Sequence, residues 1–451
     1  MVFPIQIPDD APFNAEQRSW LNQFLALALA QGDQALAPSG PSVPVTVIYG
    51  SQTGTAERLA KKLVKTLKKG NFAPEILEIG HSKSNPFPAP VVENRNLNGP
   101  GDKQTHQVAL SLDGADLSYE VGDALGVYPL NPPDVVDEII ANLPFKAINV
   151  PAPGGGEVTL RDALIHHYDI GSLNKSIIQK WQAKSGSPIL RSLVATDDKK
   201  AYDDFCWGRD LIDLVIDHPA DFVDGEDFVS NLKKLQPRLY SIASSPRTHP
   251  GEVHLCVGII RYDTFGRKRG GICSTFLADR VTGDAKPRVY VHRNNTFRLP
   301  SDGSTDVIMV GPGTGIAPFR AFLEDRKATA ALGRNWLFFG NPHRATDYLY
   351  QDEIEAYIED GTLAQFDVAW SRDQKDKLYV QHLMLQKGAE LWNWLNKGAA
   401  FYVCGDASRM AKDVDQALHK VAEEHGKLSP EEATAFISQL KKDKRYLRDV
   451  Y

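Results

Sequence analysis

The sequence predicts a multidomain protein of α/β plus β-barrel class. A β-barrel domain with a helical insertion precedes a doubly wound domain with a parallel sheet. Three observations predict this fold class. The chain has 451 residues, more than one hydrophobic core usually serves. Short alternating strands with Gly and Asp turns begin near Val92, and strand and helix patterns alternate after Pro300.

The composition is that of an ordinary globular protein, and a net charge of -6 gives no reason to expect nucleic-acid binding. The four cysteines, Cys206, Cys256, Cys273 and Cys404, form no C-x-x-C pair, so neither a metal site nor a disulfide framework is predicted. The apolar run 24–30 is too short to span a bilayer. We therefore expect a cytoplasmic protein without a membrane span.

Residues 1–44 are predicted to form a helix and a linker. Asn14 and Gln17 resemble a helix N-cap, and apolar residues recur at helical spacing up to about Ala30. Residues 31–44 are rich in Pro, Gly and Ser. We interpret the helix as a packing element without chemistry.

The stretch 45–80 contains a predicted strand (45–49), a Gly and hydroxyl loop, and an amphipathic helix (56–69). Free backbone N–H groups and the helix dipole make such a loop a phosphate cradle. The stretch resembles the phosphate loop of flavodoxin-like FMN domains. The resemblance implies that Ser51, Thr53 and Thr55 hold the FMN phosphate.

One further candidate strand (75–79) precedes the Pro-rich linker 85–90. A doubly wound sheet needs several βαβ repeats, and the loops that clasp a flavin ring follow its later strands. We therefore interpret residues 45–80 as a truncated flavodoxin-like fragment, and we expect it not to bind FMN stably. Such a small unit is expected to pack on another domain or another chain.

Residues 81–300 are predicted to form the barrel, with a helical insertion at about 131–235. Barrel strands are expected at 107–112, 122–129, 237–241, 252–262 and 288–292. Helical patterns occupy 134–143, 160–168, 175–183 and 201–216, and Thr159 with Asp162 resembles a capping box. The basic loop 267–269 either guides an acidic partner or is an ordinary solvated cluster.

The strand Arg238-Leu239-Tyr240-Ser241 carries a cation, an aromatic ring and a hydroxyl. Strand alternation directs Arg238 and Tyr240 to one face. Such a face suits a planar cofactor that bears phosphate.

Residues 301–451 carry the predicted strands 306–310, 336–339, 366–370 and 400–403. The loop 311–319 contains Gly311, Gly313 and Thr314 between a strand and a helix, the context that a nucleotide-phosphate loop requires. After the third strand come Ser371, Arg372, Lys377, Tyr379 and Gln381. Two cations, a hydroxyl and an aromatic ring suit a ribose 2′-phosphate with adenine nearby, and the alternative is a solvated charged loop.

Cys404 and Asp406 end the predicted strand 400–403, at the edge where open α/β sheets bind ligands. Taken alone, Cys404 is a buried and inert cysteine. The chain ends at Tyr451, whose ring is able to cover a second ring.

These motifs together resemble the reductase half of the cytochrome P450 reductase and sulfite reductase flavoprotein family, which is related to ferredoxin-NADP reductases. The similarity covers about residues 85–451, and the Asp-Val-Tyr ending is closer to the sulfite reductase flavoproteins. The resemblance implies an FAD barrel followed by an NADP domain. Domain limits at 1–44, 45–80, 81–300 and 301–451 follow from it and from the linkers.

The resemblance also implies roles for the site residues. Arg238 contacts the FAD pyrophosphate, Tyr240 lies on the flavin ring, and Tyr451 stacks on its other face. A second pyrophosphate contact comes from Gly271, Ile272, Cys273 and Ser274. Ser241, Cys404 and Asp449 form the hydride-transfer group. The NADPH contacts are Gly311, Gly313, Thr314, Ser371, Arg372, Lys377, Tyr379, Gln381 and Asp406.

We therefore expect an NADPH-dependent FAD reductase that passes electrons to an external acceptor, such as a redox carrier or a haem or iron–sulfur protein. One alternative is a diflavin reductase with a minimal or subunit-completed FMN site. Another is a redox-inactive subunit that only binds nucleotides. The intact group of Ser241, Cys404 and Asp449 favours an enzyme.

Overall fold

The computed structural model describes residues 43–49, 55–68, 72–78, 83–146 and 148–451. The chain divides into two compact units, residues 1–85 and 86–451. The predicted helix at 14–30, and also Ser51 and Thr53, lie outside the described residues.

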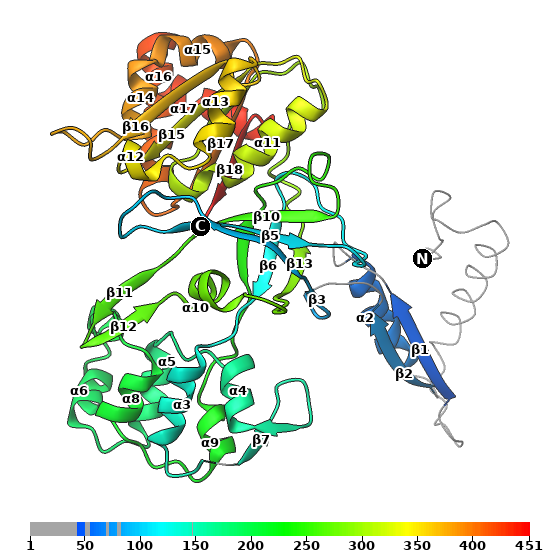
Figure 1. Ribbon diagram of the computed structural model, residues 1–451, viewed down its shortest axis with the longest axis vertical. Helices are drawn as coiled ribbons and strands as arrows, with labels where there is room; N and C mark the ends of the chain where they lie inside the picture. Colours follow the sequence, from blue (N-terminus) through cyan, green and yellow to red (C-terminus); the bar gives the residue numbers. More distant parts are fainter. Residues whose placement is uncertain (1–42, 50–54, 69–71, 79–82, 147) are drawn as a thin grey trace. The chain divides into compact units, whose positions relative to one another are not determined.

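The first unit contains two parallel strands and the helix that connects them (Figure 1). β1 (Val43–Tyr49) pairs in parallel with β2 (Phe72–Glu78), and α2 (Thr55–Leu67) lies between them in sequence. Ala60 and Leu67 of α2 are buried with Val47 of β1. The predicted order of strand, helix and strand is thus present, and Thr55 is the first residue of the helix.

The second unit begins with two antiparallel sheets that share one core. In the first sheet β5 (Thr105–Ser111) lies between β4 (Val91–Asn96) and β10 (Glu252–Gly258). The second sheet has the order β3 (Phe87–Pro88), β13 (Arg288–His292), β6 (Ala124–Tyr128) and β9 (Arg238–Ser241). A bridge between Ile242 and Leu255 joins them. Val108, Leu125 and Leu255 are fully buried between the sheets.

Seven helices between β6 and β9 form a cluster with its own core around Trp181, Phe222 and Phe228. They are α3 (Pro133–Ala141), α4 (Leu160–His166), α5 (Lys175–Gln182), α6 (Pro188–Thr196), α7 (Lys199–Cys206), α8 (Leu211–Asp217) and α9 (Gly225–Ser230). The hairpin of β7 (Asn149–Pro151) and β8 (Glu157–Thr159) precedes α4. Thr159 caps α4 by accepting the Asp162 N–H, as its sequence predicts.

The prediction of one helix at 201–216 is wrong, because α7 and α8 are separate helices. Helices α6 and α9 were not predicted. Gly208 has a φ of 70°, which interrupts the helical path. The Asp213 carboxylate then accepts the Asp210 N–H at 2.6 Å and starts a new helix. A local capping signal therefore outweighs the continuous apolar pattern.

The prediction of a loop at 267–269 is also wrong, because these residues belong to the strand β12 (Arg267–Gly270), which pairs with β11 (Arg261–Thr264). The predicted strand 252–262 accordingly ends at Gly258. Arg267 donates two hydrogen bonds to Glu138, at 2.9 and 2.7 Å. Arg269 is only 7% exposed and bonds Asp213 at 2.8 Å. Two of the three cations thus tie the hairpin to the helical cluster and are not offered to a partner.

The C-terminal part is a five-stranded parallel sheet with helices on both faces (Figure 1). The strand order is β16 (Gln365–Trp370), β15 (Asn335–Asn341), β14 (Val307–Val310), β17 (Ala400–Gly405) and β18 (Tyr446–Val450). One face packs on α11 (Ala317–Ala328) and α13 (Gln351–Glu359), near the short α12 (Arg344–Asp347). The other face packs on α14 (Val380–Gln386), α15 (Gly388–Asn396), α16 (Met410–Gly426) and α17 (Pro430–Lys442). The four predicted strands are present, and β18 was not expected.

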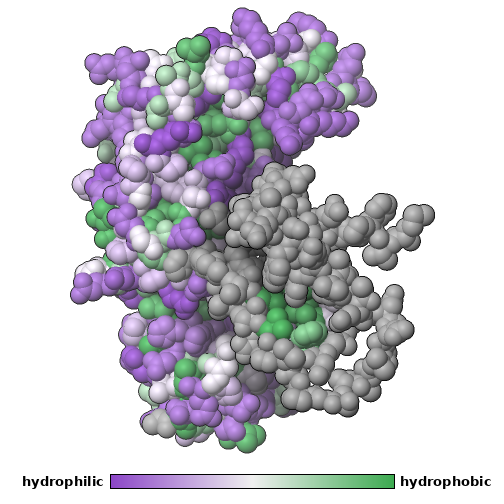
Figure 2. All heavy atoms as spheres, turned by 90° about the vertical axis from the view of Figure 1, so that its right-hand side faces the viewer, coloured by the Kyte–Doolittle hydropathy of each residue, from purple (hydrophilic) through white to green (hydrophobic). Residues whose placement is uncertain are grey.

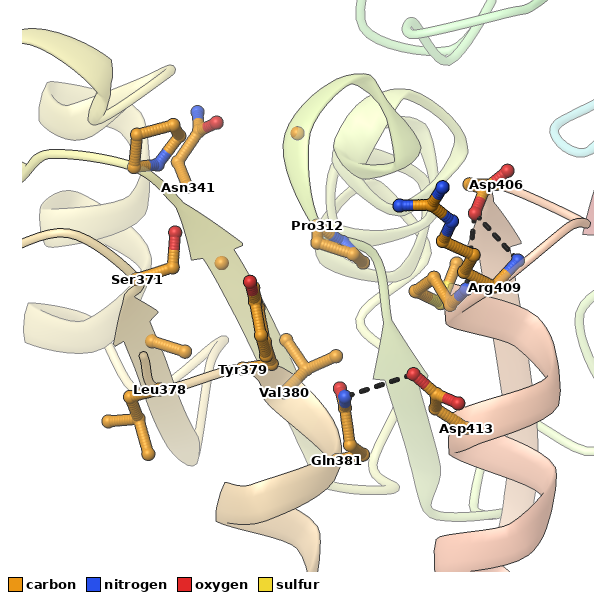
Figure 3. Close-up of a pocket in the computed structure, with 15 residues that line it drawn as sticks. Pro312, Asn341, Ser371, Leu378, Tyr379, Val380, Gln381, Asp406, Arg409 and Asp413 are labelled. Atoms are coloured by element: carbon orange, nitrogen blue, oxygen red, sulfur yellow. Dashed lines mark hydrogen bonds between the residues drawn. The ribbon is translucent and has the colours of Figure 1, made fainter. Parts of the chain in front are cut away.

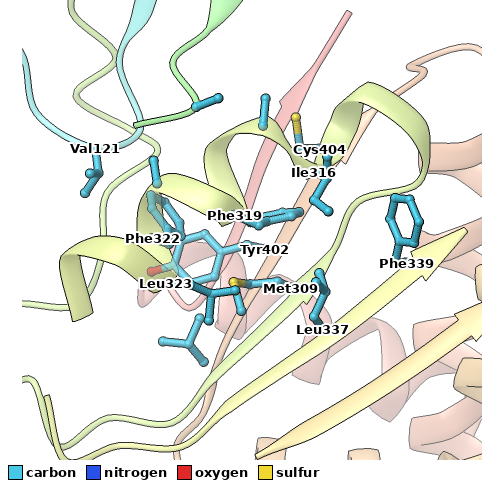
Figure 4. Packing of buried hydrophobic residues seen from close by; sticks show 14 of the residues in the cluster. Val121, Met309, Ile316, Phe319, Phe322, Leu323, Leu337, Phe339, Tyr402 and Cys404 are labelled. Atoms are coloured by element: carbon cyan, nitrogen blue, oxygen red, sulfur yellow. The ribbon is translucent and has the colours of Figure 1, made fainter. Parts of the chain in front are cut away.

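A seam joins the antiparallel sheets to α11. The aromatic core of Phe322 and Tyr402 continues onto Phe297 and Val121 from the antiparallel part (Figure 4). Beside it Arg320, 6% exposed, donates to the Ala243 carbonyl at 2.6 Å and pairs with Glu324 at 3.0 Å. The two parts of the second unit are therefore packed as one body.

Among the described residues, no helix has the length and apolarity needed to cross a membrane. Figure 2 shows one face of the molecule, where hydrophilic side chains predominate and hydrophobic ones form separate groups.

Gly126 of β6 faces Tyr290 of β13, and a Cβ at position 126 would lie 2.2 Å from the Tyr290 ring. Because Tyr290 is buried, Gly126→Ala should cost about 1–3 kcal/mol through overpacking and lower the melting temperature by several degrees. Thermal unfolding followed by circular dichroism measures the shift. The matched control is Gly186→Ala, whose Cβ meets no atom within 4 Å. Equal melting temperatures of the two variants would contradict the close contact.

Candidate functional site

The strand β9 forms one wall of a cavity of about 620 Å³. Arg238, Leu239, Tyr240 and Ser241 all line it, so the lining is not confined to the predicted face of Arg238 and Tyr240. The other lining residues that the sequence predicted are Gly271, Ile272, Cys273, Ser274, Thr314 and Tyr451. These segments lie far apart in the sequence and converge on this cavity.

Opposite β9 the cavity meets the start of the short helix α10 (Ile272–Thr275). N–H groups in the first turn of a helix have no intrahelical partner and suit an anion. A Cβ on Gly271 would lie 2.7 Å from the Ser274 hydroxyl, so this wall is closely built. A cation on β9, an aromatic ring and free N–H groups fit a planar cofactor with a pyrophosphate.

A second cavity, of about 510 Å³, also reaches α10. It shares Ile272 with the first cavity, and Gly270 is a further part of its own lining. Tyr262, 39% exposed, contributes an aromatic ring to it. Because Ile272 lines both cavities, a long cofactor is able to extend past the start of α10. No motif in the sequence predicted this extension.

Ser241, Cys404 and Asp449 form one hydrogen-bonded group. The Ser241 hydroxyl donates to Asp449 Oδ2 at 2.5 Å, and the Cys404 thiol lies 3.9 Å from the same oxygen. The register of the parallel strands β17 and β18 sets Cys404 opposite Asp449. Residues 208 positions apart thus meet at one carboxylate.

Burial controls the protonation of this group. It raises the pKa of Asp449, although hydrogen bonds from Ser241 and Cys404 and the charge of His292 act against the rise. Burial, together with the Asp449 charge, also raises the pKa of the Cys404 thiol well above its usual value. Cys404 is therefore a neutral thiol at physiological pH.

Tyr451 lies at the mouth of the 620 Å³ cavity. Its hydroxyl is 3.1 Å from the Thr314 hydroxyl, and its backbone N–H donates to Gly405 at 3.1 Å. The side chain is nevertheless 65% exposed. The backbone is held while the ring remains accessible, which suits a ring that moves aside for a ligand.

A third cavity, of about 450 Å³, opens at the carboxyl ends of the parallel strands (Figure 3). It lies where the strand order reverses, between β14 and β17, the usual ligand position in such sheets. The predicted residues that line it are Gly313, Ser371, Tyr379, Gln381 and Asp406. The structure thus joins the phosphate loop to the segment that follows β16.

Comparisons with known proteins agree with this geometry. Residues 80–276 match the model of an FAD binding domain, and residues 309–416 match that of an oxidoreductase NAD-binding domain. The chain is 46% identical over 379 residues to the sulfite reductase [NADPH] flavoprotein alpha-component of Bacillus subtilis, which covers 83% of this chain and 62% of that protein.

The alpha-component of Serratia proteamaculans is 43% identical over 405 residues, with 87% of this chain and 67% of the relative covered. That of Escherichia coli O139:H28 is 44% identical over 378 residues, with coverages of 84% and 63%. The chain belongs to the sulfite reductase flavoprotein alpha-component family. It spans about two thirds of the length of these relatives.

Of the residues predicted from the family pattern, Gly311, Arg372 and Lys377 line none of the three cavities, and Asp406 has a capping role as well as lining one. Gly311 is a packing residue, because a Cβ there would lie 2.4 Å from the Gly315 carbonyl oxygen. Arg372 and Lys377 are exposed and line none of the three cavities. The Asp406 carboxylate accepts the backbone N–H groups of Arg409 and Met410, at 2.9 and 3.2 Å, and so caps α16 at the cavity edge.

Other lining residues were missed by sequence reasoning. Arg409 adds an exposed cation to the 450 Å³ cavity, and Asp413 accepts a hydrogen bond from Gln381 at 3.2 Å (Figure 3). Their position at the start of the helix after β17 was the available signal. Lys103 lines the 620 Å³ cavity and donates to Asn341 of the 450 Å³ cavity at 2.5 Å. It carried no recognisable motif.

The protonation state of Cys404 leads to a labelling prediction. Iodoacetamide at pH 8 should modify Cys206, which is only partly buried, at least about tenfold faster than Cys404, since only the accessible thiolate reacts. Peptide mass spectrometry at timed intervals measures both rates. In guanidinium the two cysteines should react at similar rates, and rapid labelling of Cys404 in the folded protein would refute its burial.

Proposed function

We propose that this chain is an NADPH-dependent FAD reductase that takes a hydride from NADPH and passes electrons to an external acceptor. One observation carries the proposal: the hydrogen-bonded group of Ser241, Asp449 and Cys404 joins the wall of the flavin-sized cavity to the sheet that holds the nucleotide loop. The family membership of the chain supports the same reaction.

FAD occupies the 620 Å³ cavity in this proposal. Arg238 and the start of α10 at Gly271, Ile272, Cys273 and Ser274 hold the pyrophosphate, and Tyr240 lies against the flavin ring. Tyr451 covers the opposite ring face. The remainder of the cofactor extends toward Tyr262 in the 510 Å³ cavity. When bound, FAD supplies the redox chemistry, accepting two electrons and releasing them to the acceptor.

NADPH occupies the 450 Å³ cavity. Gly313 and Thr314 approach its phosphates, and Tyr379 and Gln381 line the wall for the adenosine part. Ser371 is joined by the exposed cations Arg372 and Lys377 at the ribose 2′-phosphate, and Arg409 adds a further charge. Lys103 reaches across to Asn341 and is placed to meet a ligand that runs between the cavities.

The protein's own residues position the nicotinamide and shape its electrostatic environment. Displacement of the Tyr451 ring would open the flavin face, which Ser241 borders, while Cys404 is buried 3.9 Å from the Asp449 oxygen that Ser241 bonds. The Asp449 carboxylate places negative charge beside a nicotinamide ring that becomes positive. Ser241 holds that carboxylate in one orientation through its 2.5 Å hydrogen bond.

Further parts of the proposal concern organisation and partners. The two antiparallel sheets, bridged at Ile242, support a flavin-type barrel at 81–300 followed by an NADP domain at 301–451. The unit of β1, α2 and β2 supports a flavodoxin-like fragment at 45–80. The acceptor is a separate redox protein with a haem or iron–sulfur centre, and the reaction takes place in the cytoplasm.

Stopped-flow spectroscopy tests the proposed function directly. Protein saturated with FAD is mixed with NADPH under anaerobic conditions, and the flavin absorbance should bleach within the dead time or in a single fast phase. Absence of bleaching in fully loaded protein would instead favour a subunit that only binds nucleotides. Release and chromatographic separation of the bound flavin should give FAD without an equal amount of FMN.

Replacement of Asp449 separates catalysis from stability. Asp449→Asn keeps an acceptor for Ser241 but removes the charge, so the rate of flavin bleaching should fall about 10²-fold. Burial raises the pKa of Asp449 in the folded protein, so the folded state favours the protonated carboxyl. The contribution of this carboxyl to the free energy of unfolding therefore falls as the pH rises through its pKa in the folded protein. The neutral variant should therefore melt no lower than wild type at pH 7.5. Asp116→Asn, an exposed carboxylate, is the control for both measurements.

The 2′-phosphate assignment is tested by two charge removals. Arg372→Ala with Lys377→Ala should weaken NADPH binding about 10- to 100-fold, while NADH binding changes little, because only NADPH offers the additional phosphate. Titration of the oxidised protein with NADP⁺ and NAD⁺ measures the affinities. The control is Lys375→Ala, an exposed lysine of the same loop. Equal losses for both nucleotides would remove the phosphate contact from the proposal.

A further inference from the structure

A cluster of two histidines and a glutamate lies beside the seam between the antiparallel sheets and α11. His249, Glu252 and His254 each offer one ligand atom, and these three atoms lie within 4.8 Å of one another. Within the described part of the chain, this is the one group of His, Cys, Asp and Glu residues with such spacing. It lies outside the three cavities described above.

Local structure explains why these side chains converge. Glu252 and His254 alternate on β10, so both point to the same face of the strand. His249 comes from the preceding turn, where its N–H donates to the Ser245 carbonyl at 2.9 Å. The centroids of the His249 and His254 imidazole rings are 4.1 Å apart. The cluster is therefore built by the backbone and not by flexible side chains alone.

Hydrogen bonds already orient the three side chains of the cluster. His254 Nε2 lies 2.9 Å from Glu252 Oε2, and His249 Nε2 lies 3.0 Å from Glu324 Oε1 of α11. The side chains of His249 and Glu252 are 27% and 35% exposed, whereas that of His254 is 6% exposed. An ion from solvent thus has a route to ligands that are positioned in advance.

The surrounding charges favour a divalent cation. Three carboxylates, those of Glu252, Glu324 and Glu353, bond the two histidines or Arg320, so acidic side chains outnumber this one guanidinium by two. Arg320 is itself held by Glu353 at 2.6 Å and by the Ala243 carbonyl. A bound divalent ion would neutralise this excess charge.

We propose that His249, Glu252 and His254 form a site for one zinc ion at this seam. Two imidazole nitrogens and one carboxylate oxygen are a ligand set that Zn²⁺ prefers, with water as the fourth ligand. Glu324 accepts the remaining N–H of His249 and orients that ring. Because Glu324 belongs to α11 and the three ligands belong to the turn and β10, the ion fastens the nucleotide-binding part to the flavin-binding part.

Zinc binding requires a proton shift in His254. Coordination through Nε2 moves the ring proton to Nδ1, which lies 3.5 Å from Arg320, at the far limit of a hydrogen bond. The shift therefore replaces that contact with two N–H donors that face each other, a cost that the bonds to zinc have to exceed, and the Glu252 oxygen that accepted the proton becomes a ligand instead. No oxidant or reductant takes part.

Equilibrium dialysis against ZnCl₂ tests the site. Tag-free, FAD-loaded protein is stripped with a chelator, and bound zinc is measured by plasma mass spectrometry. Wild type should take up one zinc ion that His249→Asn binds at least about tenfold more weakly, the loss expected when a metal site loses an interaction. His249 is the more exposed histidine, so this variant should fold normally. His166→Asn, which alters the adjacent histidine pair on α4, is the matched control and should bind zinc like wild type.

A thermal-shift measurement tests the zinc site without counting bound ions. Zinc should raise the melting temperature of wild type and His166→Asn by mass action, and should not raise that of His249→Asn. Zinc uptake and thermal shift that are the same in wild type and His249→Asn would overturn the proposal. So would an absence of zinc uptake by wild type, which would leave the cluster as a purely hydrogen-bonded clasp.

Discussion

The arrangement of the second unit depends on the buried guanidinium of Arg320. It donates to the Ala243 carbonyl at 2.6 Å and pairs with Glu353 at 2.6 Å and Glu324 at 3.0 Å. Burial of one cation among three partners costs desolvation energy, and such a network is satisfied only when all partners are in place. Ala243 lies two residues beyond Ser241, and Arg320 lies on the helix that continues the phosphate loop. One side chain therefore sets β9 against the loop at Gly313.

That fixed seam explains how a strand at one end of the chain completes a site built in the middle. β18 adds to β17 in parallel, and its register sets Asp449 opposite Cys404 and within 2.5 Å of Ser241. A slip of one residue would turn Asp449 to the other face of the sheet, where no charge is needed. The same backbone pairing carries on to Tyr451, whose N–H bonds Gly405. One ladder of backbone hydrogen bonds thus places Tyr451 at the cavity and sets Asp449 and Cys404 beside Ser241, which lines it.

Sequence reasoning found the parts of the site that are local and missed those that are not. Arg238 to Ser241, Gly271 to Ser274 and the loop at Gly313 each carry their chemistry within a few residues, and each lines a cavity. Lys103 was missed because its partner, Asn341, is 238 residues away. The cations at 267–269 were misjudged for the same reason, because Glu138 and Asp213 are distant in sequence. β18 was missed because charged residues interrupt its apolar pattern.

The position of the 620 Å³ cavity bears on how electrons would leave the chain in the proposed function. Leu239 is 50% exposed and Tyr451 is 65% exposed, and both line the cavity, so one side of it faces solvent. The first unit, in the part that the structure describes, buries only Val47, Ala60 and Leu67 in its core. A parallel sheet is stable when both faces are covered, and two strands with one helix cover one face. Among its described residues this unit has two strands and one helix, fewer elements than a doubly wound flavin-binding sheet contains, and in the proposed function the acceptor approaches the open side of the 620 Å³ cavity.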